Sequence, residues 1–206
     1  MPLASGYATS LWPQDALVTS HYKLPLGNDL PPGQYAIALT LITSSSGEET
    51  GTFILPIPVR IVEAARNFAI PEMQKLIGAD FGKQIRLLGY DLQRKEKNLL
   101  LTLHWQALSN MTTDYKIFVH LFDPATEQIV SQQDILAGGD EHPTSRWVPE
   151  EVVSSKVDLG LENVPAGDHR LAVGLYHADE RLPIVAPQDF AVSADRLLLN
   201  ETVRVP

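Results

Sequence analysis

The chain has 206 residues, of which 44% are hydrophobic and 20% charged, a composition that excludes intrinsic disorder and repetitive fibres. Its net charge of −9 is the wrong sign for phosphates or anionic lipid surfaces, so nucleic acid is not expected as a partner. The absence of cysteine excludes disulfides, zinc–thiolate sites and thiol nucleophiles. A globule of this size buries about 70% of its unfolded surface, so the length permits one large β domain or two small ones.

The beginning of the chain lacks the basic residues and the long apolar run of a secretory signal peptide. The densest apolar stretch, residues 35–42, is far shorter than the roughly 20 residues of a spanning helix. We therefore expect no signal or transmembrane segment of the chain's own.

An internal repeat organises the chain. The motif Thr-Ser-x-Trp occurs at residues 9–12 and again at 144–147, an offset of 135. At this offset, residues 9–28 are identical to their counterparts at 8 of 20 positions, and an offset of 134 then adds 4 of 13. Both copies pass through a turn rich in proline and glycine into a second alternating segment. The same unit therefore occurs twice, with the first copy shorter than the second.

The first copy, residues 1–63, predicts three strands, at residues 16–26, 34–43 and 52–62. Apolar and polar residues alternate along them, which is typical of a strand with one buried face. The stretch before residue 9 is too short to hold the front half that the second copy has. The three strands then bury one face each without an opposing sheet. We expect them to lean on the second copy, to pair with another chain, or to belong to a protein that begins earlier.

Residues 64–79 form a predicted linker. Within it, Pro71 at a first helical position, Glu72 beside it and Gly78 at the end predict one or two turns of helix.

Residues 80–206 predict a complete domain. Alternating segments at residues 84–92, 98–107, 114–123 and 128–135 precede the repeated part and are separated by turn-rich stretches. About eight strands of roughly ten residues indicate an all-β fold, an antiparallel β-sandwich of jelly-roll or immunoglobulin-like topology. Parallel α/β folds are excluded because the crossover helices are missing.

Six segments carry a resemblance to a known family, namely residues 81–92, 101–107, 114–121, 143–147, 174–176 and 181–183. They resemble the tandem β-sandwich domains at the extracytoplasmic C-terminal end of bacterial polytopic membrane glycosyltransferases, of the protein-mannosyltransferase and arabinosyltransferase-like type, and of related membrane proteins. The resemblance implies an accessory domain at the extracytoplasmic face of a bacterial membrane, in a chain truncated at its beginning. It implies no catalytic residue, because the family's glycosyl transfer resides in membrane helices and acidic loops that are absent here.

One group of candidate ligand-binding residues comes from two predicted strands. The odd positions of residues 99–105 carry the apolar phase, which places His104 on the opposite face, and Phe118, His120 and Phe122 share one face of the next strand. If these strands pair, the four side chains form a polar-aromatic face of the kind that binds sugars. The alternative is a pair of hydrogen-bonded histidines on a half-covered sheet.

The second group is the Arg146-Trp147 loop. The indole would stack on a sugar ring while Arg146 donates hydrogen bonds to hydroxyls. The alternative is that Trp147 plugs the open end of the sandwich, and the recurrence of the motif in both copies favours this alternative.

Chemistry-bearing motifs point away from an enzyme. Asp134, Asp140 and Glu141 surround a Gly-Gly pair but lack the spacing of a calcium loop, and the histidines lack metal-ligand spacing. Glu150 and Glu151 are adjacent carboxylates that we expect to be solvated loop charge. A G-x-S-x-G elbow and phosphate-binding loops are missing. We expect no cofactor and no metal.

These observations predict a non-enzymatic accessory β-sandwich module of a bacterial extracytoplasmic or membrane-associated assembly, which binds carbohydrate. The alternative is a purely structural or protein-interaction domain of a truncated membrane glycosyltransferase. The expected partners are a glycan, the membrane-embedded region of the same parent protein, or a second copy that associates through the incomplete repeat.

Overall fold

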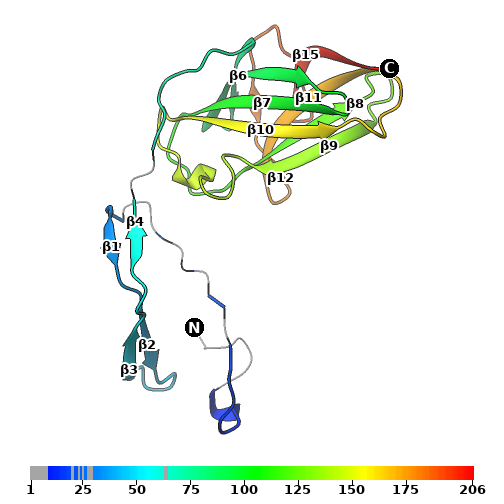
Figure 1. Ribbon diagram of the computed structural model, residues 1–206. Coiled ribbons are helices and arrows are strands. Elements are labelled where there is room, and N and C mark those ends of the chain that lie inside the picture. The colour runs from blue at the N-terminus through cyan, green and yellow to red at the C-terminus, as the bar shows by residue number, and fades with distance from the viewer. Residues whose placement is uncertain (1–8, 20, 23, 25, 27–29, 63–64) are drawn as a thin grey trace. The chain divides into compact units, whose positions relative to one another are not determined.

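The computed structural model describes residues 9–19, 21–22, 24, 26, 30–62 and 65–206, and it confirms an all-β fold with antiparallel pairing throughout the described strands. The chain divides into two compact units, Met1–Ala65 and Arg66–Pro206 (Figure 1). The boundary between them falls inside the predicted linker of residues 64–79.

The first unit contains two short antiparallel pairs and one turn of 3-10 helix, η1 (Thr9–Leu11). Strand β1 (Gly33–Tyr35) pairs with β4 (Val59–Ile61), and β2 (Ala38–Ile42) pairs with β3 (Glu49–Ile54). The strand expected at residues 52–62 is divided between β3 and β4, because Pro56 and Pro58 lie between them and have no N–H for a ladder. The strand expected at residues 16–26 is absent from the described residues of that range.

The second unit is a sandwich of two antiparallel sheets (Figure 1). Sheet I has the order β10-β7-β6-β5-β13, and sheet II has the order β14-β15-β11-β8-β9 with β12 paired to β11. The strand bounds are β5 Lys75–Phe81, β6 Ile85–Arg94, β7 Asn98–Ala107, β8 Lys116–Phe122, β9 Ile129–Leu136, β10 Val152–Gly160, β11 Gly167–His177, β12 Glu180–Arg181, β13 Ile184–Val185, β14 Val192–Ser193 and β15 Arg196–Val205, with the 3-10 turn η2 at Thr144–Arg146.

The core of this unit lies between the sheets and follows the period-two pattern of the sequence. Leu101, Leu103 and Trp105 of β7 are fully buried, as are Leu171 and Val173 of β11. Each strand contributes alternate side chains because successive residues point to opposite faces. The inward phase predicted for these strands is confirmed.

The helix expected between Pro71 and Gly78 is not formed. Strand β5 begins at Lys75 and pairs with β6, and its residues Ile77 and Ala79 are buried in the core. Gly78 adopts a left-handed φ of 77°, but it does so where the β5–β6 register shifts rather than at a helix end. Burial of alternate residues against sheet II therefore outweighs the local helix-capping pattern.

The internal repeat is reproduced in the strand registers. In the first unit Gly33 lies opposite Ile61, and in the second unit Gly167 lies opposite Val205. Further along, the pair Leu39–Phe53 of β2 and β3 corresponds to the pair Val173–Leu197 of β11 and β15. The same offsets of 134 and 144 residues relate both sets of pairs. Between the two sets of pairs, the register shifts by two residues in each copy. Strands β1 and β2 therefore correspond to β11, and β3 and β4 correspond to β15, with the register shift at the same place.

Local hydrogen bonds repeat as well. The Tyr35 hydroxyl donates to the Pro31 carbonyl over 2.7 Å, and His169 Nε2 makes the same contact with the Pro165 carbonyl over 2.8 Å. The two Thr-Ser-x-Trp motifs both close a 3-10 turn with the tryptophan N–H donating to the threonine carbonyl. Strands β1–β4 of the first unit are thus a structural copy of the β11–β15 part of the sandwich.

Candidate functional site

The predicted polar-aromatic face does not exist as one surface. His104 lies on β7 in sheet I, which pairs with β6 and β10, whereas His120 lies on β8 in sheet II, which pairs with β9 and β11. The condition for a shared face, that these two strands pair, is not met, because the chain crosses from one sheet to the other between them. Since both histidines point away from the core, they lie on opposite outer faces of the sandwich.

On the outer face of sheet II, the phenyl rings of Phe118 and Phe122 are buried beneath arginines. The guanidinium carbon of Arg181 lies 4.7 Å from the Phe118 ring centre, and that of Arg196 lies 5.2 Å from the Phe122 ring centre. Such cation–π packing covers the faces of the rings. Neither phenylalanine therefore presents a stacking platform for a sugar.

His120 lies between these two rings and is 7% exposed. Its ring centre is 4.7 Å from that of Phe118, and its Nδ1 is buried without a hydrogen-bond partner among the described residues. Burial lowers the pKa of His120, and the positive charges of Arg181 and Arg196 add to the effect while Asp134 opposes it. The imidazole is accordingly neutral at physiological pH.

Trp147 is 1% exposed, and its indole N–H donates to the His142 carbonyl over 2.9 Å. Its side chain belongs to the core cluster, as the end-plugging alternative predicted. Thr144 closes the adjoining turn by donating to the Thr113 carbonyl over 2.7 Å. Arg146 remains exposed and donates to the Glu141 carbonyl. The indole is therefore not available for stacking on a sugar.

Glu151 differs from the expectation of solvated loop charge, because its side chain is only 2% exposed. It accepts hydrogen bonds from Arg66 at 2.6 Å, from His142 at 2.9 Å and from the Val148 N–H at 3.0 Å. A buried carboxylate needs such partners to offset its desolvation. Its role is to hold the segment at Arg66 against the loop that carries η2.

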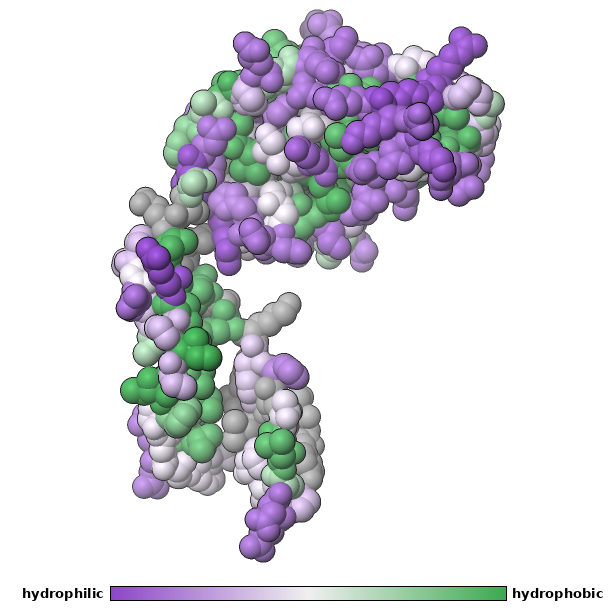
Figure 2. Space-filling model, in the orientation of Figure 1, coloured by the Kyte–Doolittle hydropathy of each residue, from purple (hydrophilic) through white to green (hydrophobic). Residues whose placement is uncertain are grey.

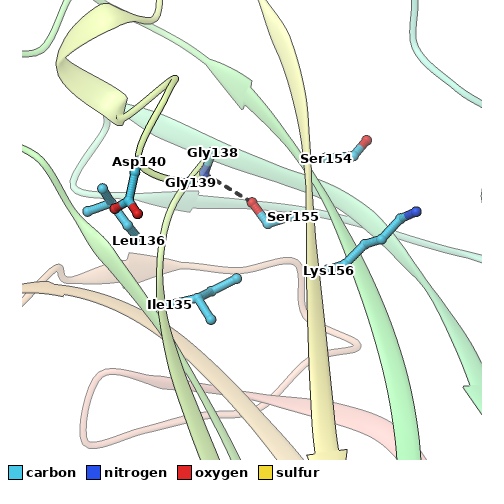
Figure 3. Close-up of a pocket in the computed structure, with 8 residues that line it drawn as sticks. All are labelled: Ile135, Leu136, Gly138, Gly139, Asp140, Ser154, Ser155 and Lys156. Atoms are coloured by element: carbon cyan, nitrogen blue, oxygen red, sulfur yellow. Dashed lines mark hydrogen bonds between the residues drawn. The ribbon is translucent and has the colours of Figure 1, made fainter.

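A cleft of about 560 Å³ lies where the end of β9 meets the edge strand β10 (Figure 3). The buried Ser155 hydroxyl accepts a hydrogen bond from the Gly138 N–H over 3.3 Å across it. Figure 3 shows Ser154 and Lys156 projecting from the side of β10 opposite to Ser155. The residues that line the cleft are Ile135, Leu136, Gly138, Gly139, Asp140, Ser154, Ser155 and Lys156.

The outer face of sheet I carries a hydrogen-bonded chain of three side chains that the sequence motifs do not reveal. His104 Nε2 lies 2.9 Å from Asp91 Oδ2, and His104 Nδ1 lies 2.8 Å from Ser154 Oγ. His104 is 5% exposed, whereas Ser154 is exposed. The hydrogen bond with His104 lowers the pKa of Asp91, and a second bond from the Gln74 N–H acts in the same direction.

Strands of the first unit carry apolar side chains that remain exposed, visible as the hydrophobic surface in Figure 2. Leu39 is 46% exposed and Phe53 is 61% exposed. Their repeat counterparts in the second unit, Val173 and Leu197, are fully buried. The same pair of strands therefore has an occupied apolar face in one unit and an open one in the other.

Among the described residues, no group of three or more metal-ligating side chains gathers closely enough to hold an ion. None of the described helices has the length and hydrophobicity that a membrane crossing requires. Comparison with models of protein families and with curated proteins finds no match to the chain.

Proposed function

We propose that the protein is an assembly module whose first unit is completed by strands from a partner polypeptide. The observation that supports this proposal is the repeat of strand registers between the two units combined with their opposite burial. Leu39 and Phe53 occupy the positions that Val173 and Leu197 occupy in the sandwich, yet they are 46% and 61% exposed. Exposed apolar surface of this kind marks an interaction site.

The second unit indicates the kind of partner. There the inward face of β11 and β15 packs on sheet I, and the edge of β11 that faces away from β15 pairs with β8. The partner is therefore a block of antiparallel strands like β5–β9, with alternate apolar side chains and one strand that adds to the edge of β2. Burying a leucine or phenylalanine that is exposed contributes about 1.5–3 kcal/mol, so several such contacts are needed to outweigh the entropy lost on association.

The resemblance given above supports placing this module at the extracytoplasmic face of a bacterial membrane, in an assembly built around a glycosyltransferase. Carbohydrate binding is not the function that we propose. In the first of the two predicted groups, His104 and His120 lie on opposite faces, and in the second the Trp147 indole is buried.

The repeat allows a direct test in which the strands that we assign to the partner are added in cis. Thr9 is the counterpart of Thr144, so placing residues 66–143 directly before Thr9 recreates the spacing of the complete unit. In this fusion, residues 66–143 precede residues 9–206. We expect the backbone amides of β1–β4 to exchange at least tenfold more slowly in the fusion than in the native chain, because they become part of a closed sandwich.

A matched control is the same fusion carrying Phe53→Asp, which places a charge on the face that must pack and is expected to cancel the protection. Exchange of the β1–β4 amides that is unchanged in the fusion would contradict the proposal. Light scattering on the native chain measures whether a second copy of the chain covers this face instead. A dimer that Phe53→Asp dissociates would show that a second copy, rather than a different strand block, covers this face.

A further inference from the structure

Asp91, His104 and Ser154 form a hydrogen-bonded row on the outer face of sheet I, in the second unit. These residues lie on β6, β7 and β10, which are neighbours in the sheet. Ser154 stands directly opposite His104 in the β7–β10 register. On the other side, Gly89 stands opposite His104 and has no side chain, so Asp91 reaches the imidazole from its place opposite Thr102, two pairs along the ladder.

The hydrogen bonds define the proton on the imidazole. An ionised Asp91 carboxylate only accepts hydrogen bonds, so the contact with His104 Nε2 requires the proton to be on Nε2. In the neutral imidazole with its proton on Nε2, Nδ1 accepts the hydrogen bond of the Ser154 hydroxyl. Asp91 is in turn held by the Gln74 N–H over 2.7 Å. This is the order of contacts that activates a serine: nucleophile to base, and base to an orienting carboxylate.

Exposure of the three groups agrees with that role. The imidazole is shielded from water at 5% exposure, while the serine hydroxyl at the end of the chain is on an exposed residue of the edge strand β10. Lys156 projects from the same side of β10, so a positive charge lies near any negative charge that develops beside Ser154 (Figure 3). The neighbouring pair Thr102–Lys156 is polar, which fits a short acyl group better than a fatty chain.

We propose that Ser154 is a nucleophile for acyl transfer from short-chain esters of polar alcohols, with His104 as its general base and Asp91 as a positioning residue. Ser154 Oγ forms a bond to the acyl carbon as its proton passes to His104 Nδ1. The bond from the acyl carbon to the alcohol oxygen breaks, and the leaving alcohol takes the proton from His104. Water then attacks the acyl-serine with the same base, which releases the acid and restores Ser154.

The experiment treats the full chain with a fluorophosphonate probe and maps the modified residue by peptide mass spectrometry. We expect phosphonylation at Ser154 at least tenfold faster than at Ser131, whose hydroxyl donates to the Gly160 carbonyl and not to an imidazole. The same chain is expected to hydrolyse p-nitrophenyl acetate. Ser154→Ala abolishes both the label and the hydrolysis, whereas the control Ser131→Ala changes neither.

Two further variants separate chemistry from structure. His104→Gln is expected to slow labelling at least a hundredfold, in the range typical of a lost general base. Asp91→Asn is expected to lower kcat for p-nitrophenyl acetate and to leave KM unchanged, since the imidazole keeps a hydrogen-bond partner but loses the carboxylate that orients it. Equal labelling of Ser154 and Ser131 in the unmodified chain would overturn the proposal, and this comparison holds even if His104→Gln does not fold.

Discussion

Leu197 and Phe53 occupy equivalent places in the two copies of the repeat, so truncating each to alanine compares a covered face with an open one. Leu197 is fully buried opposite Val173 in sheet II, whereas Phe53 is 61% exposed opposite Leu39. Removing a buried leucine side chain to alanine costs about 2–5 kcal/mol, because it combines lost apolar burial with a cavity. Truncating an exposed strand residue costs about 1 kcal/mol or less.

These values translate into separate shifts of the unfolding transition. For a unit of the size of residues 66–206, about 3 °C in Tm corresponds to 1 kcal/mol, so we expect Leu197→Ala to lower Tm by ~6–15 °C. Phe53→Ala is expected to leave that transition within about 3 °C of the native chain. The assay is thermal and urea unfolding followed by far-ultraviolet circular dichroism, which reports the strands of both units. Equal decreases in Tm from the two variants would contradict an open face at Phe53, because Phe53 would then have to be packed against a core.

Three further predictions concern the second unit. Gly138→Ala is expected to lower the free energy of unfolding by about 2 kcal/mol or more, because Gly138 has a φ of 79° and a Cβ there would clash with the His142 carbonyl. The control Gly139→Ala should cost less, because Gly139 has a φ of 77° but open space around it. Urea unfolding measures both. Burial lowers the pKa of His120 below its ordinary value of 6.5, so the unfolded state binds a proton at a higher pH than the folded state does. The contribution of His120 to the free energy of unfolding is therefore present above about pH 6.5 and is lost as the pH falls. The free energy of unfolding should differ less between about pH 7.5 and pH 5 in His120→Gln than in the native chain. Glu151→Ala is expected to lower Tm by ~5–9 °C, because Arg66 and His142, which are each about a quarter exposed, lose their charge-assisted hydrogen bonds at a cost of about 1.5–3 kcal/mol. A shift below about 3 °C would show that the contacts of Glu151 do not stabilise the unit.

The phase of each strand could be predicted from the sequence because it depends on local alternation. Leu101, Leu103 and Trp105 point inward in the structure as the pattern indicates, and the repeat predicted from identities is found again in the registers. Local pattern was misleading at Pro71 to Gly78, where a helix-like sequence leads into a strand. There the burial of Ile77 between the sheets decided the conformation.

Strand order could not be predicted, because pairing partners are remote in sequence. His104 therefore seemed to share a face with His120, although the two lie in different sheets. For the same reason the Asp91–His104–Ser154 chain escaped motif analysis, since its members are separated by 13 and 50 residues. Only the register that puts Ser154 opposite His104 reveals it. Glu151 similarly looked like loop charge until its partner Arg66, 85 residues away, was in view.

Amide hydrogen exchange on the native chain, compared between equivalent strands of the two copies, measures directly whether the apolar face of the first unit is uncovered. If the first unit is an uncovered copy of the β11–β15 pair, the amides of Leu39 and Phe53 will exchange at least a hundredfold faster than those of Val173 and Leu197, although the registers are the same. Equal protection at the two pairs would contradict the account, because the first unit would then already have the apolar cover that we assign to a partner.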